Sequence, residues 1–280
     1  MNRRGVLIGA AAASLAGSLH AETVFRLALT PVFLDNDALV IDRLHAALAE
    51  GMGRSIELVQ RRTYQDITGA LLEGSVDAAW VCGFPFLQHE SELSLIGVPV
   101  WNGKPLYRSY LIVASDDPAR NLTDLRGGIH AFSDPDSNSG YLVTASDLAR
   151  MGETPDHFFS RTIYTYGHRN VVRAVAAGLA RSGSVDGYVW EVLAQVEPAM
   201  TAGTRVIGRS EWLGFPPFAA RRDRSADADL ILFRNTVLRL HETATGRAAL
   251  ASLYLDRVDP GSIALFDGIA ARMAAIHWAP

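Results

Sequence analysis

Short apolar segments alternate with amphipathic segments of helical length along the first part of the chain, and this alternation restricts the fold more than any other feature. Residues 23–30 and 55–60 contain the β-branched and aromatic side chains typical of strands. Residues 38–52 and 64–72 instead repeat their apolar positions with helical spacing. Strands that alternate with helices of this length form βαβ units. The sequence therefore predicts an α/β protein with mainly parallel sheets flanked by helices.

The same pattern restarts near residue 110, which divides the chain into two blocks of similar size. The strands predicted in the second block cover residues 109–114, 129–132, 162–166, 184–189 and 204–208. We expect residues 22–110 to form the first part of one lobe, residues 111–210 to form a second lobe, and residues 211–280 to return to the first lobe with C-terminal helices. Two such lobes would enclose a cleft, which is a preferred place for a ligand.

The first 21 residues have the features of a secretory signal peptide. Arg3 and Arg4 precede an apolar stretch that is too short to cross a bilayer, and Ala21 is a small residue suited to a cleavage site. The arginine pair also fits the twin-arginine route. We therefore expect an exported, periplasmic protein.

Charge and cysteine content exclude several classes. The formal net charge is −4, and no basic stripe runs along the chain, which argues against nucleic-acid binding. Cys82 is the single cysteine, so an exported form would have no internal disulfide and would depend on its core for stability. We expect a monomer without cofactor or metal.

A polar loop before a predicted helix is the strongest candidate site. Ser137, Asn138, Ser139 and Gly140 stand at a helix start, where several backbone N–H groups lack partners. Their side chains can cap the helix, or they can surround an anion together with the N–H groups. One oxygen suffices for a cap, so the crowding of two hydroxyls and an amide favours an additional oxyanion site. The pattern alone leaves both interpretations open.

Several motifs together resemble the family of phosphonate-, phosphite- and phosphate-binding receptors of ABC importers. They lie at residues 64–67, 74–80, 107–113, 121–127, 133–143, 166–170 and 183–186. The resemblance extends from about residue 25 to about residue 266. It implies a type II periplasmic-binding-protein fold whose two lobes close over a small oxyanion and deliver it to a membrane permease.

The resemblance also implies which residues hold the ligand. By their positions in the motifs, these are Ser137, Asn138 and Ser139 at the helix start, His168 on a neighbouring loop, and Tyr64 and Tyr107 from the other lobe. From the residues alone, His168 is equally a satisfied loop histidine, and the two tyrosines are core or rim aromatics.

One departure bears on the ligand. Relatives that bind aminoalkyl phosphonates place carboxylates near the ligand amine. Glu191 is a candidate for one of these, but the later acidic position falls within residues 213–218, which contain no acid. A small inorganic or alkyl-substituted oxyanion therefore fits better than a ligand with an ammonium group.

Cys82 supports two alternatives to an importer receptor. It follows a predicted strand and is expected near the cleft, where a lone cysteine is most often a small buried hydrophobe. A thiolate, however, binds soft centres, and some relatives sense arsenic oxyanions for a histidine kinase. The chain is then a periplasmic oxyanion sensor, for example of arsenite. A less favoured alternative is an enzyme that uses Cys82 or His168.

Overall fold

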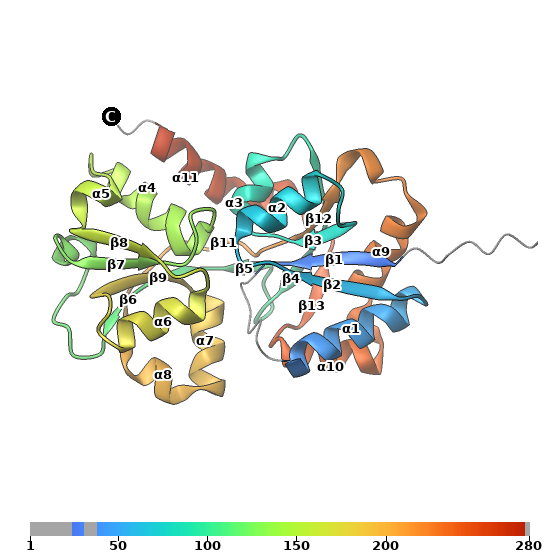
Figure 1. The fold of residues 1–280 in the computed structure, drawn as a ribbon, viewed down its shortest axis with the longest axis horizontal. Coiled ribbons are helices and arrows are strands. Elements are labelled where there is room, and N and C mark those ends of the chain that lie inside the picture. The colour runs from blue at the N-terminus through green and yellow to red at the C-terminus, as the bar shows by residue number, and fades with distance from the viewer. Residues whose placement is uncertain (1–23, 31–37, 278–280) are drawn as a thin grey trace, which may run out of the picture.

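A computed structural model describes residues 24–30 and 38–277 of the chain, and Figure 1 shows two α/β lobes side by side. The predicted signal peptide lies outside the described residues. Within the described ranges, no helix combines the length and the apolarity that a membrane span requires.

The first lobe is built on a six-stranded sheet in the order β13–β4–β12–β3–β1–β2. Its strands are β1 (Phe25–Leu29), β2 (Ile56–Gln60), β3 (Ala78–Trp80), β4 (Leu93–Val100), β12 (Phe218–Arg221) and β13 (Arg257–Asp259). Its α-helices are α1 (Ala38–Met52), α2 (Tyr64–Leu72), α3 (Gly83–Gln88), α9 (Ala228–Leu238) and α10 (Ala244–Ser252). Short 3-10 turns are η3 (Arg222–Arg224), η4 (Leu240–Glu242) and η5 (Ile263–Phe266).

The second lobe is built on a five-stranded sheet in the order β10–β6–β9–β7–β8. Its strands are β6 (Ser109–Ala114), β7 (Ile129–Phe132), β8 (Arg161–Tyr164), β9 (Ser182–Asp186) and β10 (Thr204–Arg209). Its helices are η1 (Leu122–Leu125), the π-helical turn η2 (Asn138–Leu142), α4 (Val143–Ala149), α5 (Pro155–Phe158), α6 (His168–Ala176), α7 (Gly187–Val196) and α8 (Pro198–Ala202).

Both sheets are mixed, whereas the sequence predicted mainly parallel sheets. Strands β3, β1 and β2 run parallel, as do β9, β7 and β8. Strand β12 is antiparallel to β3, and β6 is antiparallel to β9. The reason is chain direction: β3, β7 and β9 end between the lobes, while β6 and β12 begin there after the chain has crossed from the other lobe. The α/β class with flanking helices is confirmed.

The strand predicted over residues 184–189 ends earlier than expected, at Asp186. Helix α7 begins at Gly187 and includes the rest of the predicted strand. Strand β9 stops at Asp186, whose carboxylate accepts hydrogen bonds from the N–H groups of Tyr188 and Val189 and so caps α7. An aspartate placed directly before a possible first helical turn was the signal for this boundary.

The centre of the second lobe contains a satisfied polar group. His130 on β7 is fully buried and hydrogen-bonds through its two ring nitrogens to the hydroxyls of Ser182 and Ser184 on β9, at 2.8 and 2.9 Å. Burial lowers the pKa of His130 to about 3, so the ring stays neutral at ordinary pH. The buried hydroxyls of these serines need hydrogen-bond partners inside the sheet, and His130 provides them.

Among the described residues, three chain segments connect the lobes or lie across them. Two are chain crossings, which pair as the short antiparallel strands β5 (Leu106–Tyr107) and β11 (Leu213–Gly214). The third is the C-terminal helix α11 (Asp267–His277), which lies against α3 of the first lobe and α4 of the second (Figure 1).

A buried arginine fastens α11 to the second lobe. The side chain of Arg272 is 4% exposed. Its guanidinium donates to three groups of α4: the Val143 carbonyl, the Ser146 hydroxyl and the Asp147 carboxylate. It also binds both carboxylate oxygens of Glu211, at 2.8 and 2.5 Å. Such a fork-to-fork pair is among the stronger charge-assisted interactions.

We expect Arg272→Ala to lower the free energy of unfolding by about 2–3 kcal/mol, because several hydrogen bonds to one buried charge are lost together. Urea unfolding followed by circular dichroism measures this. The control is Arg239→Ala, since Arg239 forms an ion pair with Glu242 while its side chain is 71% exposed, and removing such a pair should cost at most about 0.5 kcal/mol. Equal effects of the two changes would show that the α11 contact is not a stabilising link.

Candidate functional site

The predicted site residues come together between the lobes, and all are buried. The structure places Tyr64 at the start of α2, Cys82 just before α3, Tyr107 in β5, Ser137 before η2, Asn138, Ser139 and Gly140 within η2, and His168 at the start of α6. Direct hydrogen bonds link the first-lobe and second-lobe members.

The serine loop folds around its own hydrogen bonds. Ser137 caps η2, because its hydroxyl oxygen accepts from the Gly140 N–H at 3.0 Å. The Ser109 hydroxyl on β6 donates to the Ser139 carbonyl at 2.6 Å and holds the turn against the sheet. The capping interpretation therefore describes the geometry of Ser137. Its hydroxyl proton is not used by the cap and remains available as a donor.

Glycine at position 140 permits a close approach of two chain segments. The Gly140 carbonyl accepts from the Ser133 N–H at 3.2 Å. A Cβ atom added to Gly140 would lie 1.8 Å from the Ser133 hydroxyl oxygen and 2.7 Å from its Cβ. A side chain at this position would thus push the loop away from the end of β7.

His168 is neutral and has one defined tautomer. The Asp186 N–H donates to its Nδ1 at 3.1 Å, so that nitrogen carries no proton. Burial lowers the pKa of His168 to about 3, so the ring carries a single proton, on Nε2. Nε2 lies 3.1 Å from the Tyr64 hydroxyl oxygen and donates to it. The Tyr64 hydroxyl therefore keeps its own proton, which it can donate to another acceptor.

Cys82 and Tyr107 also accept a hydrogen bond and keep a proton that they can donate. The Asn138 backbone N–H donates to the Cys82 sulfur at 3.3 Å, and the Asn138 side-chain amide donates to the Tyr107 hydroxyl oxygen at 2.8 Å. Burial raises the pKa of the Cys82 thiol to about 12 and raises that of Tyr107 well above its usual value. Both groups therefore keep their protons.

Two carboxyl groups that the prediction did not assign to the site border it. Asp134 accepts from the Tyr64 N–H at 3.1 Å, and Asp186 lies behind His168. Burial raises the pKa of Asp134 and raises that of Asp186 to about 7. Asp186 is the last residue of β9 and Asp134 lies two residues after β7, both inside motifs noted above, so an aspartate near a strand end was the usable signal. The predicted carboxylate Glu191 instead accepts from the Tyr110 hydroxyl at 2.9 Å.

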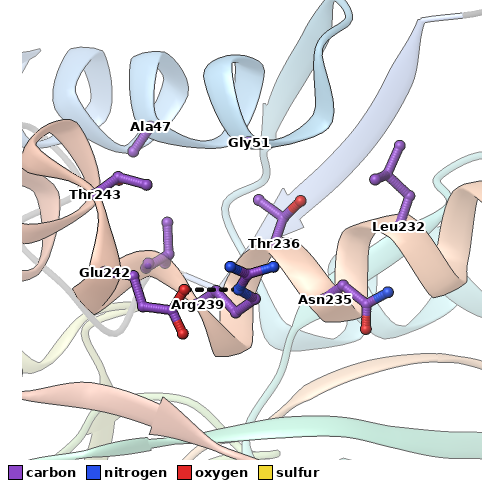
Figure 2. A pocket seen from close by; sticks show the side chains of 9 residues that line it. Ala47, Gly51, Leu232, Asn235, Thr236, Arg239, Glu242 and Thr243 are labelled. Atoms are coloured by element: carbon purple, nitrogen blue, oxygen red, sulfur yellow. Dashed lines mark hydrogen bonds and ion pairs between the residues drawn. The ribbon is translucent and has the colours of Figure 1, made fainter.

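The described residues contain no group of three or more His, Cys, Asp or Glu side chains that could hold a metal ion. A pocket of about 360 Å³ lies elsewhere, on the first lobe between α1 and α9 (Figure 2). It is lined by Ala47, Gly51, Leu232, Asn235, Thr236, Arg239, Leu240, Glu242 and Thr243, none of which belongs to the predicted site.

We expect Gly140→Ala to displace the serine loop, because the added methyl group would overlap Ser133. The change should lower the free energy of unfolding by about 1–3 kcal/mol, the usual cost of overpacking. The matched control is Gly69→Ala in α2, where an added Cβ meets nothing within 4 Å and better helix propensity should add up to about 1 kcal/mol. Thermal unfolding compares the two. A Gly140→Ala protein as stable as wild type would contradict the close approach.

The chain is similar to known proteins over most of its length. Residues 30–266 match the family described as ABC transporter, phosphonate, periplasmic substrate-binding protein. The phosphate-import protein PhnD of Mycolicibacterium smegmatis is 25% identical over 192 residues, which are 64% of this chain and 60% of that protein. The match thus spans less than two thirds of that relative's length.

Two solved structures share the fold. A binding protein component of an ABC phosphonate transporter from Pseudomonas aeruginosa has a TM-score of 0.84 at 19% identity, covering 91% of this chain and 87% of that one. PhnD1 from Prochlorococcus marinus, in complex with methylphosphonate, has a TM-score of 0.79 at 15% identity, covering 91% of this chain and 98% of that one. The two-lobed type II periplasmic-binding-protein fold is thereby confirmed, and the chain belongs to the family of periplasmic phosphonate-type substrate-binding proteins of ABC transporters.

Proposed function

We propose that the protein is an exported receptor that captures a small oxyanion of the phosphonate, phosphite or phosphate class between its lobes and delivers it to an ABC importer. The observation that carries the proposal is a set of hydroxyl and thiol groups in the site that can each donate a hydrogen bond. The oxygen or sulfur of Tyr64, Cys82, Tyr107 and Ser137 already accepts a hydrogen bond from the protein. Each group therefore keeps its own proton, which it can donate to a ligand oxygen.

These donors are divided between the lobes, which supports capture by lobe closure. Tyr64 and Cys82 belong to the first lobe, Tyr107 lies on a crossing strand, and Ser137 belongs to the second lobe. An anion held by all of them interacts fully only when the lobes are together. Its binding energy therefore stabilises the closed state over the open one, which is the thermodynamic requirement for ligand-driven closure.

Location and partner follow from the family and the first residues. The predicted signal peptide over residues 1–21 would direct the chain to the periplasm. There the closed form would present its ligand to a permease. Family membership supports this role and points to a transport protein.

The positions of Cys82 and His168 support binding over catalysis. Both ring nitrogens of His168 are engaged, by the Asp186 N–H and the Tyr64 hydroxyl, so neither is placed to take a proton from the thiol. The raised pKa of Cys82 also keeps the sulfur as a thiol, which is a poor nucleophile and a poor ligand for a soft centre. We therefore assign Cys82 the role of a neutral donor.

A thermal-shift panel tests the proposed ligand class. Phosphate, phosphite and methylphosphonate should include at least one compound that raises the melting temperature in a saturable way, because a ligand of the folded state stabilises it by mass action. Arsenite should leave the melting temperature unchanged. A shift with arsenite that disappears in Cys82→Ser, with no response to the phosphorus oxyanions, would favour the sensor alternative.

A second experiment tests the serine loop. We expect the double change Ser137→Ala and Ser139→Ala to weaken binding of the best panel ligand by about 1–3 kcal/mol for each lost bond to the charged ligand, as measured by calorimetry. The control is Ser252→Ala on α10, where the hydroxyl donates only to the Ala249 carbonyl, and affinity should not change. Unaltered affinity in the double variant would leave Ser137 as a helix cap alone.

A further inference from the structure

One acceptor stands out among the donors of the site. The Asn138 side-chain oxygen is completely buried and has no hydrogen-bond partner among the residues that the structure describes. The nitrogen of the same amide donates to Tyr107, and the backbone N–H of Asn138 donates to Cys82. The oxygen is therefore fixed between the lobes, where a buried acceptor without a donor costs free energy.

A fully deprotonated anion would not satisfy this oxygen. Two oxygens without a proton between them repel each other, so an acceptor aimed at an anion is unfavourable unless the ligand itself carries a hydrogen. A phosphorus oxyanion with one charge supplies one, because one of its oxygens is then a hydroxyl.

The surrounding charges point the same way. Burial raises the pKa of the Tyr64 hydroxyl well above its usual value, and the negative charges of Asp134 and Asp186 raise it further. Asp186 also acts in this way on Cys82 and Tyr107. The donors themselves are neutral, including His168. Neutral dipoles next to carboxyl groups suit a monoanion better than a dianion.

We propose that the site selects the protonated, singly charged form of its oxyanion, and that the side-chain oxygen of Asn138 accepts the hydrogen bond from the ligand's acidic hydroxyl. This inference rests on the proposed function and adds the protonation state of the ligand to it. Asn138 is then a specificity-determining residue that separates phosphonates from sulfonates of the same shape and charge.

A matched ligand pair tests the proposal. In mildly acidic buffer, methylphosphonate and methanesulfonate both carry one negative charge on a tetrahedral head group, but only methylphosphonate has an acidic hydroxyl. We expect calorimetry to show about ten- to hundredfold tighter binding of methylphosphonate, the usual effect of leaving a buried acceptor unpaired. Equal binding of the two overturns the inference and leaves the proposed function standing. If neither compound nor any phosphorus oxyanion binds, both fail.

Two substitutions locate the effect at Asn138. Asn138→Ala should bring the affinities for the two ligands to within a few-fold of each other. The difference that remains in this variant measures the weaker acceptor strength of the sulfonate oxygens. Asn138→Asp offers only acceptor oxygens and should keep the preference for methylphosphonate. If Asn138→Asp loses the preference for methylphosphonate as completely as Asn138→Ala does, the amide nitrogen faces the ligand and the proposal is wrong.

Asn235→Asp, at an exposed position of α9, is the matched control and should leave both affinities unchanged. Circular dichroism and the melting temperature establish that each variant folds. If an Asn138 variant does not fold, equal binding of the two ligands by the wild-type protein still overturns the inference.

Discussion

The hydrogen bond from the Asp186 N–H to His168 Nδ1 determines the chemistry of the site. It removes the proton from Nδ1, so the neutral ring carries its proton on Nε2 and donates to Tyr64. Without this bond the ring could take the other tautomer, and the Tyr64 hydroxyl would then donate its hydrogen bond to the histidine. The bond exists because β9 ends at Asp186 and α6 begins at His168. The end of a central strand in one lobe thus determines which atom the hydroxyl proton of a tyrosine from the other lobe can bind.

The repeated elements of the fold were accessible from the sequence, because hydrophobic periodicity is a local property. Helices α1 and α2 and the strands before them lie where the pattern predicted them. Strands β5 and β11 have two residues each and exist only through their mutual pairing, so no local signal marks them. The direction of β6 and β12 was missed for a related reason: it depends on where the chain crosses between lobes, which periodicity does not encode.

The residues of the candidate site could be predicted from the sequence, but their roles as hydrogen-bond donors or acceptors could not. The motifs indicated the serine loop, His168 and the tyrosines, and the structure brings them together. Whether each group donates or accepts depends on partners up to 104 positions away, as for Tyr64 and His168. Burial, another tertiary property, decides that Cys82 is a thiol and that Asp186 titrates near neutrality.

The helix α11 has a mechanical consequence for how such a receptor could open. Arg272 ties this helix to α4 of the second lobe, and α11 also lies against α3 and η5 of the first lobe. A motion that preserves both sets of contacts must pivot close to α11, so the lobes separate least there and most at the distant edge. The last helix of the chain would then set the axis of rotation, although it contributes none of the predicted ligand contacts.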